Sequence, residues 1–114
     1  MLGLTGAHRI WFIPDIHDMR LGKYRLLASV KGVFPNPYNG DVFAFMSSDK
    51  KKLKLVRYYG HKHILWDISY DRGYKFMRPV YVEDSKEVRY QLDYKYLVAL
   101  LECPVQNELI INTN

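Results

Sequence analysis

Five cations lie close together in a segment whose sequence, SSDKKKLKLVRYY, runs from residue 47 to residue 59. They are Lys50, Lys51, Lys52, Lys54 and Arg57. Asp49 is the only carboxylate among them, and Tyr58 and Tyr59 follow directly. Cations at this density neutralise phosphate groups and aromatic rings stack on bases, so the segment predicts a hairpin that binds nucleic acid. The alternative is structural, because lysines at hairpin tips and on exposed strands also prevent sheets from pairing edge to edge.

Other reactive residue types form no recognisable catalytic or metal-binding pattern. His61 and His63 have the spacing of two ligands on one strand face, but no third ligand follows nearby. Most of the aspartates are explained by helix caps and turns. Their spacing does not single out a group of carboxylates that could bind the two metal ions of a nuclease. Cys103 has no adjacent base, and the chain contains no phosphate loop, GxSxG or HExxH motif. We therefore expect no enzyme activity, no cofactor, no metal and no small-molecule substrate.

Length and composition indicate one folded domain spanning residues 1–114. The chain is 48% hydrophobic and 25% charged, which is ordinary for a globular protein. A single cysteine excludes an internal disulfide and fits a reducing compartment. No apolar run is long enough to span a membrane, and the first residues, MLGLTGAHRIWF, lack the pattern of a signal peptide. We therefore expect a soluble cytoplasmic protein without membrane contact.

The positive charge is concentrated in the first half of the chain. Residues 1–57 carry ten Lys and Arg against four Asp and Glu, whereas residues 58–114 carry seven against eight. The net charge of +5 makes an anionic partner worth considering, and this distribution assigns the basic surface mainly to the first half.

The first elements are predicted from turn and cap residues. Residues 8–13 have strand composition, and Pro14 ends them. Asp18 can cap a helix that begins near Met19, and Gly32 can end it. Gly22 inside this helix indicates either close packing at that residue or a later start of the regular helix. The segment 34–40 contains two prolines and an Asn-Gly pair, which predicts a connecting turn.

A three-stranded antiparallel meander is expected next, with strands at 41–47, 52–58 and 63–68. The first of these is apolar on both faces, which is typical of a central strand covered on both sides. Residues 74–89 predict irregular structure or an edge strand, Asp93 can cap a closing helix, and the tail forms a short strand or frays. The fold class is α+β: a small antiparallel sheet, made of the N-terminal strand plus the meander, with two helices packed on one face.

Several stretches, taken in order, resemble one known family. They are GLTGAHRIWF (3–12), DMRLG (18–22), PYNGDVFAF (37–45), KLKLVRYYG (52–60) and DRGYKF (71–76). This series is similar to the small accessory protein TnpB, encoded by the second open reading frame of bacterial insertion sequence 66 elements. The closing segment LVALLE (97–102) resembles that family's last helix, so the resemblance covers nearly the whole chain. The family usually has arginines where this chain has Lys50, Lys51 and Lys52.

The resemblance implies a non-catalytic role in transposition beside a separate, larger transposase, with DNA or the transposase as partner. Under the first hypothesis the basic hairpin binds DNA phosphates. Its contact residues are Lys50, Lys51, Lys52, Lys54, Arg57, Tyr58 and Tyr59. Under the alternative, the protein is an adaptor that binds the transposase without touching DNA, through aromatic residues such as Tyr58, Tyr59 or Trp66.

Overall fold

The computed structural model describes Leu4 and the ranges 8–31, 39–70, 74–81, 91–103 and 108–111. Along the chain the elements are β1 (Ile10–Phe12), α1 (Lys23–Ser29), β2 (Val42–Met46), β3 (Lys52–Tyr59), β4 (Lys62–Ser69), β5 (Arg78–Tyr81), α2 (Tyr94–Glu102) and β6 (Glu108–Ile111). The predicted strands of the first half and the closing helix are confirmed, and so is the short strand in the tail. Gly32, most of the connector 34–40 and the charged run 83–87 lie outside the described residues.

The main sheet has the strand order β1-β2-β3-β4 and mixed strand directions. The meander is confirmed, because β2 pairs antiparallel with β3, and β3 with β4. The prediction of an entirely antiparallel sheet was wrong at β1, which pairs parallel with β2 from Ile10 opposite Val42 to Phe12 opposite Ala44. Two parallel neighbours need a crossover connection, and here the chain between them contains α1.

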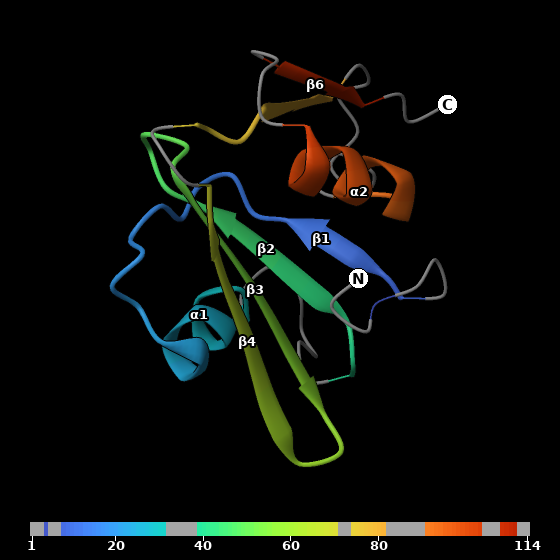
Figure 1. Cartoon of the computed structure of the whole chain (residues 1–114). Coiled ribbons are helices and arrows are strands. Elements are labelled where there is room, and N and C mark those ends of the chain that lie inside the picture. The colour runs from blue at the N-terminus through green and yellow to red at the C-terminus, as the bar shows by residue number, and fades with distance from the viewer. Residues whose placement is uncertain are drawn as a thin grey trace.

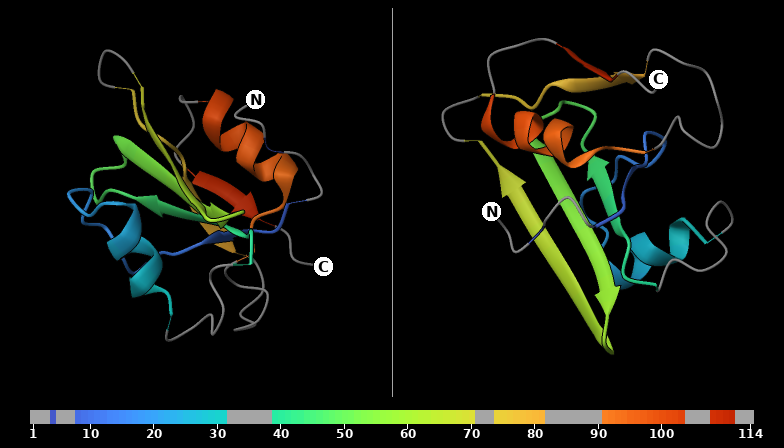
Figure 2. Two further views of the ribbon diagram at one scale, coloured as in Figure 1. Left: turned by 90° about the horizontal axis from the view of Figure 1, so that it is seen from below. Right: turned by 90° about the vertical axis from the view of Figure 1, so that its right-hand side faces the viewer.

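The two helices lie on opposite faces of this sheet, as Figures 1 and 2 show. Phe43 and Phe45 of β2 pack with Leu26 and Leu27 of α1. Successive strand residues point to opposite sides, so the intervening Ala44 faces the cluster of α2. The prediction that both helices cover one face was therefore wrong. The prediction that β2 is covered on both sides, because its residues are apolar on both faces, is confirmed: all five of its residues are buried.

A second sheet covers the outer side of α2. In it β5 pairs parallel with β6, from Arg78 opposite Glu108 to Tyr81 opposite Ile111, and α2 lies between the two strands in sequence. For residues 78–81 the edge-strand alternative is thus confirmed, and Pro79 is tolerated because this strand pairs on one side. The beginning of β5 lies near the β2–β3 turn, because the N–H of Phe76, two residues before β5, donates to the Lys50 carbonyl at 2.8 Å.

Asp18 does not cap α1, contrary to the prediction. The helix begins at Lys23 with Gly22 as its N-cap, so the alternative of a later start is correct. Asp18 instead accepts hydrogen bonds from the backbone and guanidinium of Arg20, and these bonds lower the pKa of its carboxyl group. Asp93 does occupy the N-cap position of α2, but its side chain makes no capping bond.

Within the described ranges, no helix is both long enough and apolar enough to cross a membrane.

Candidate nucleic-acid interface

The turn between β2 and β3 is held in shape by hydrogen bonds from its own side chains. The Ser47 hydroxyl donates to the Asp49 carboxylate at 2.7 Å, and the backbone N–H of Lys51 donates to the same oxygen at 3.1 Å. The backbone N–H of Lys52 donates to Ser47 Oγ at 3.0 Å. These bonds stabilise the ionised carboxylate and lower the pKa of Asp49, with the Ser47 bond as the largest cause. The predicted hairpin tip is therefore an ordered turn that presents its lysines from a defined backbone.

Lys50 has a left-handed backbone conformation, with φ of 61°. Its N–H donates to the Ser47 carbonyl at 3.0 Å, and its own carbonyl accepts the N–H of Phe76 at 2.8 Å. The second bond ties the turn to the segment that leads into β5. A lysine rarely adopts this conformation, which costs about 1–2 kcal/mol, so these bonds must hold it in place.

Cations distant in the sequence therefore meet at this end of the molecule. Lys75 is close enough to Asp49 to contribute to the lowering of its pKa, and Arg78 lines the same hollow as Lys50. The β2–β3 turn lies at the opposite end of the main sheet from the β3–β4 turn (Figure 1). We call Lys50, Lys51, Lys52, Lys75 and Arg78 the basic end.

The predicted cations of β3 lie in different environments. Lys51 and Lys52 are exposed, and Lys50 is half-buried. Lys54 is only 7% exposed, and its ammonium donates to the Leu21 carbonyl at 3.1 Å, with Asp67 of β4 at 4.0 Å. The structure thus places Lys54 between β3 and the start of α1, where its charge is used inside the fold.

Arg57 lies at the other end of β3, apart from the lysines of the turn. Its Nε donates to the Gly40 carbonyl at 2.8 Å, and its guanidinium carbon lies 4.4 Å from the ring centroid of Tyr59. Gly40 has φ of +95°, and a Cβ there would meet the Tyr59 ring at 3.6 Å. Arg57, Tyr59 and Gly40 therefore form one fixed cluster.

Tyr58 and Tyr59 point to opposite faces of the sheet, as successive strand residues must. Tyr58 packs on the α1 side, where its ring meets the His63 ring edge-on with 4.6 Å between the ring centroids. The His63 ring also packs against the Tyr24 ring, with 4.2 Å between the centroids. Tyr59 is 59% exposed. Trp66 is partly buried against the α2 core. The structure does not bring these rings together as one stacking platform.

Two hollows flank the β2–β3 turn and share His17, Ser47 and Ser48. The first, of about 360 Å³, lies towards β5, and the second, of about 450 Å³, lies towards Lys51 and Lys52. His17 Nδ1 lies 2.9 Å from the Met46 carbonyl oxygen, and because that oxygen can only accept, Nδ1 donates. The loop after β1 is thereby attached to the end of β2.

The family model for IS66 Orf2 like protein matches residues 8–107 of the chain. This chain belongs to the IS66 Orf2-like family. The resemblance seen in the sequence motifs is thus confirmed, and the family is that of an accessory protein of an insertion sequence. The comparisons with curated proteins and with solved structures gave no significant match.

Sequence reasoning missed three residues that this IS66 Orf2-like protein places near the turn. Lys75 and Arg78 belong to a half of the chain whose overall charge is slightly negative, so the charge count concealed them. The two cations in YKFMR were a usable signal, because Lys75 stands three residues before Arg78, the first residue of β5. His17 carries no local signal, because only the packing of its loop on Met46 places it there.

Proposed function

We propose that this protein assists insertion-sequence transposition by binding DNA phosphates through its basic end. The observation that carries the proposal is the convergence of Lys50, Lys51 and Lys52 with Lys75 and Arg78. The one carboxylate among the turn residues, Asp49, is occupied by bonds from Ser47 and Lys51. A surface of this kind attracts the phosphate backbone without requiring a base sequence.

The proposal assigns different roles to the cations predicted from the sequence. Lys51 and Lys52 are exposed and contact phosphate directly, whereas Lys54 and Arg57 are held by carbonyl oxygens of the chain itself. Each phosphate contact adds about 0.9 to the steepness of log K against log salt on duplex DNA. The five cations of the basic end together therefore support a slope of about −4.5.

Fluorescence anisotropy on labelled element-end DNA and on scrambled DNA, over a salt series, tests the proposal. The variant K51Q/K52Q should flatten the salt slope by about 1.8 and weaken binding to both duplexes. The matched control is K23Q/K62Q, which removes the same charge at the far end of the sheet, about 23 Å along β3. Lys62 is exposed there, and the Lys23 ammonium reaches the His63 carbonyl at 3.5 Å.

The two variants separate a local contact from a general charge effect. A flatter slope for K51Q/K52Q alone supports the proposal, and tighter binding of element-end DNA than of scrambled DNA connects it to transposition. Equal slopes for both variants and the unmodified protein would remove the basic end from the proposal.

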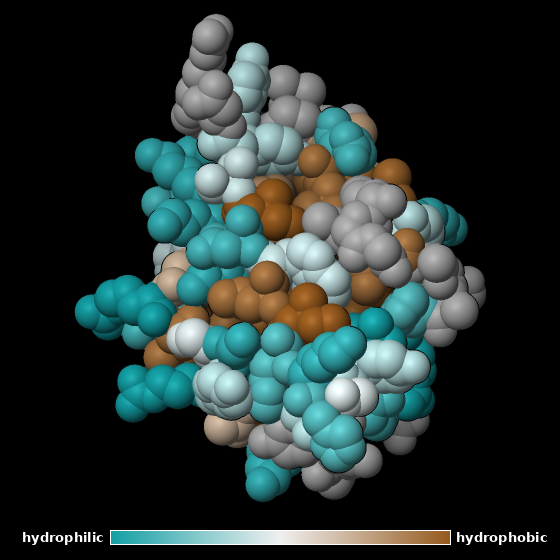
Figure 3. Space-filling view, turned by 60° about the horizontal axis from the view of Figure 1, so that its bottom comes forward, coloured by the Kyte–Doolittle hydropathy of each residue, from teal (hydrophilic) through white to brown (hydrophobic). Residues whose placement is uncertain are grey.

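A second candidate function, binding the transposase without DNA, rests on the exposed cluster around Tyr59. Tyr and Arg dominate the binding energy of many protein interfaces, and Arg57 already fixes the Tyr59 ring. Figure 3 shows hydrophobic side chains exposed between hydrophilic ones on one face of the molecule. Association with transposase that survives nuclease digestion and is lost in Y59A would favour this function, and loss on digestion would count against it.

A further inference from the structure

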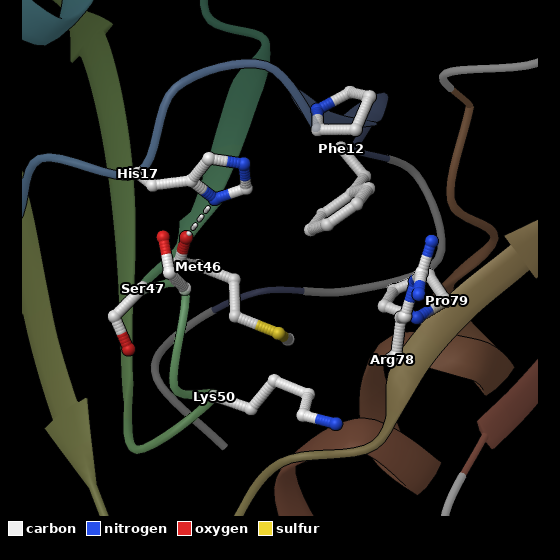
Figure 4. Close-up of a pocket in the computed structure, with 9 residues that line it drawn as sticks. Phe12, His17, Met46, Ser47, Lys50, Arg78 and Pro79 are labelled. Atoms are coloured by element: carbon white, nitrogen blue, oxygen red, sulfur yellow. Dashed lines mark hydrogen bonds between the residues drawn. The ribbon is translucent and has the colours of Figure 1, made fainter.

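The hollow beside Lys50 combines cationic and apolar walls. Its lining includes Lys50, Arg78 and His17 together with Phe12, Met46 and Pro79. Figure 4 shows the Phe12 ring and the Met46 thioether between His17 on one side and Arg78 with Pro79 on the other. The Lys50 side chain extends along the same space towards Arg78 (Figure 4). These residues come from β1, the loop after it, the end of β2, the β2–β3 turn and β5, so only the folded chain creates the hollow.

The polar groups of the hollow suit an anion. Lys50 supplies a point charge, and the planar guanidinium of Arg78 supplies donors in a fork that matches two phosphate oxygens. In Figure 4 the second ring nitrogen of His17 lies on the side of the ring towards Phe12. With Nδ1 donating to the Met46 carbonyl, this Nε2 is an acceptor in the neutral ring and a donor in the charged ring.

The apolar wall indicates that the ligand is larger than a bare phosphate ion. The volume of about 360 Å³ is within the range of small-molecule sites, and Phe12, Met46 and Pro79 present carbon and sulfur to it. Phe12 and Met46 are only 6% and 4% exposed, so a base in the hollow would touch the exposed edge of the ring and of the thioether. With its phosphate on Lys50 and Arg78, such a ligand satisfies both walls together. A nucleotide has this composition.

We propose that the hollow beside Lys50 binds a single nucleotide unit, its phosphate held by Lys50 and Arg78 and its base lying against Phe12 and Met46. The inference rests on the proposed function and deepens it, because it adds a site for an unstacked nucleotide next to the phosphate-binding surface. The left-handed backbone of Lys50, tied to Phe76, holds the ammonium at the edge of the hollow. The same chemistry is present in a free nucleotide and at the unpaired end of a DNA strand.

The test is a titration followed by the methyl signals of ¹³C-labelled methionines. Met46 lines the hollow and reports on it, whereas Met77 is buried in the α2 core and serves as the internal control. The probes are thymidine 5′-monophosphate, thymidine, and a 5′-phosphorylated single strand of four thymidines. K50N and R78Q remove the cations, and asparagine tolerates the left-handed conformation of residue 50. K23Q/K62Q is again the matched control.

Thymidine monophosphate should shift the Met46 signal saturably, and thymidine should bind about tenfold more weakly because it lacks the phosphate. K50N and R78Q should each raise the dissociation constant about tenfold, and K23Q/K62Q should leave it unchanged. If the four-thymidine strand binds at least tenfold more tightly than the monophosphate, the source is a strand end, and equal affinities identify the free nucleotide. The inference would be overturned if thymidine monophosphate did not shift the Met46 signal, or if K50N and R78Q both bound it as tightly as the unmodified protein does.

The two proposals fail separately. If K51Q/K52Q flattens the salt dependence of DNA binding but the Met46 methyl signal does not shift with nucleotide, the DNA-binding surface is supported and the nucleotide site is refuted. A saturable Met46 shift in a protein that shows no salt-dependent duplex binding would leave the nucleotide site and remove the proposed function.

Discussion

Lys52 and Lys54 stand two residues apart on one face of β3, and they should respond oppositely to mutation. Lys52 is exposed, whereas Lys54 is buried with its ammonium on the Leu21 carbonyl. K54A should therefore reduce the free energy of unfolding and K52A should not. K52A should flatten the salt slope of DNA binding by about 0.9, and K54M should leave that slope unchanged.

The magnitude for Lys54 follows from what alanine removes. The three methylene groups beyond Cβ are worth about 2.4 kcal/mol when buried. The Leu21 carbonyl, deprived of this donor, costs about 1–3 kcal/mol. Release of a buried ammonium returns part of that, so we expect a net loss of about 3 kcal/mol. K54M keeps most of the stem and should lose about 1 kcal/mol, while K52A should stay within about 0.5 kcal/mol of the unmodified protein.

Urea denaturation followed by tryptophan fluorescence measures these free energies, and anisotropy over a salt series measures the slopes. The m-values of the variants must agree with that of the unmodified protein for the comparison to hold. A K54A variant as stable as the unmodified protein would refute the assignment of Lys54 to the fold. A folded K54M whose slope falls as far as that of K52A would show that Lys54 contacts DNA.

Three further predictions concern other parts of the fold. G40A forces a Cβ onto a backbone at φ of +95°, so it should cost about 1–2 kcal/mol in thermal unfolding and loosen the Arg57 side chain held by residue 40. Burial, with smaller contributions from two neighbouring acidic groups, raises the pKa of Tyr70 above its usual 10.0. Its contribution to stability is thus complete below about pH 10 and lost as the pH rises through the raised value, so melting curves at rising pH should fall more steeply for the unmodified protein than for Y70F. D41A removes the carboxylate that accepts hydrogen bonds from Arg9 Nε at 3.1 Å and from Trp11 Nε1 at 3.0 Å. It should lower the free energy of unfolding, measured by urea denaturation, by about 2 kcal/mol.

Most of the elements were predictable because their signals are local. The alternation in 52–58 and the proline at 14 each act on neighbouring residues, and strands formed where they indicated. The closing helix begins directly after Asp93, as predicted, although the Asp93 side chain makes no capping bond. The helix after β1 begins later than predicted, at Lys23, because the Asp18 carboxylate accepts hydrogen bonds from Arg20 and does not cap a helix. A short polar side chain can satisfy either a helix end or a turn, and the local sequence does not decide between them.

The motifs along the chain also determined the family, and the cluster of lysines in the first half determined where a basic surface would begin. Tertiary structure alone decided which of those lysines remain available. Lys54 and Lys52 share a strand face and a residue type, but only Lys54 is covered, by the segment at Leu21 that leads into α1. That segment lies over this face because β1 pairs parallel with β2, so the chain between them must cross over the sheet. The same packing brought Lys75, Arg78 and His17 to the turn. Contacts between residues far apart in the chain follow from strand direction and from which helix covers which face, and neither is encoded in a local spacing.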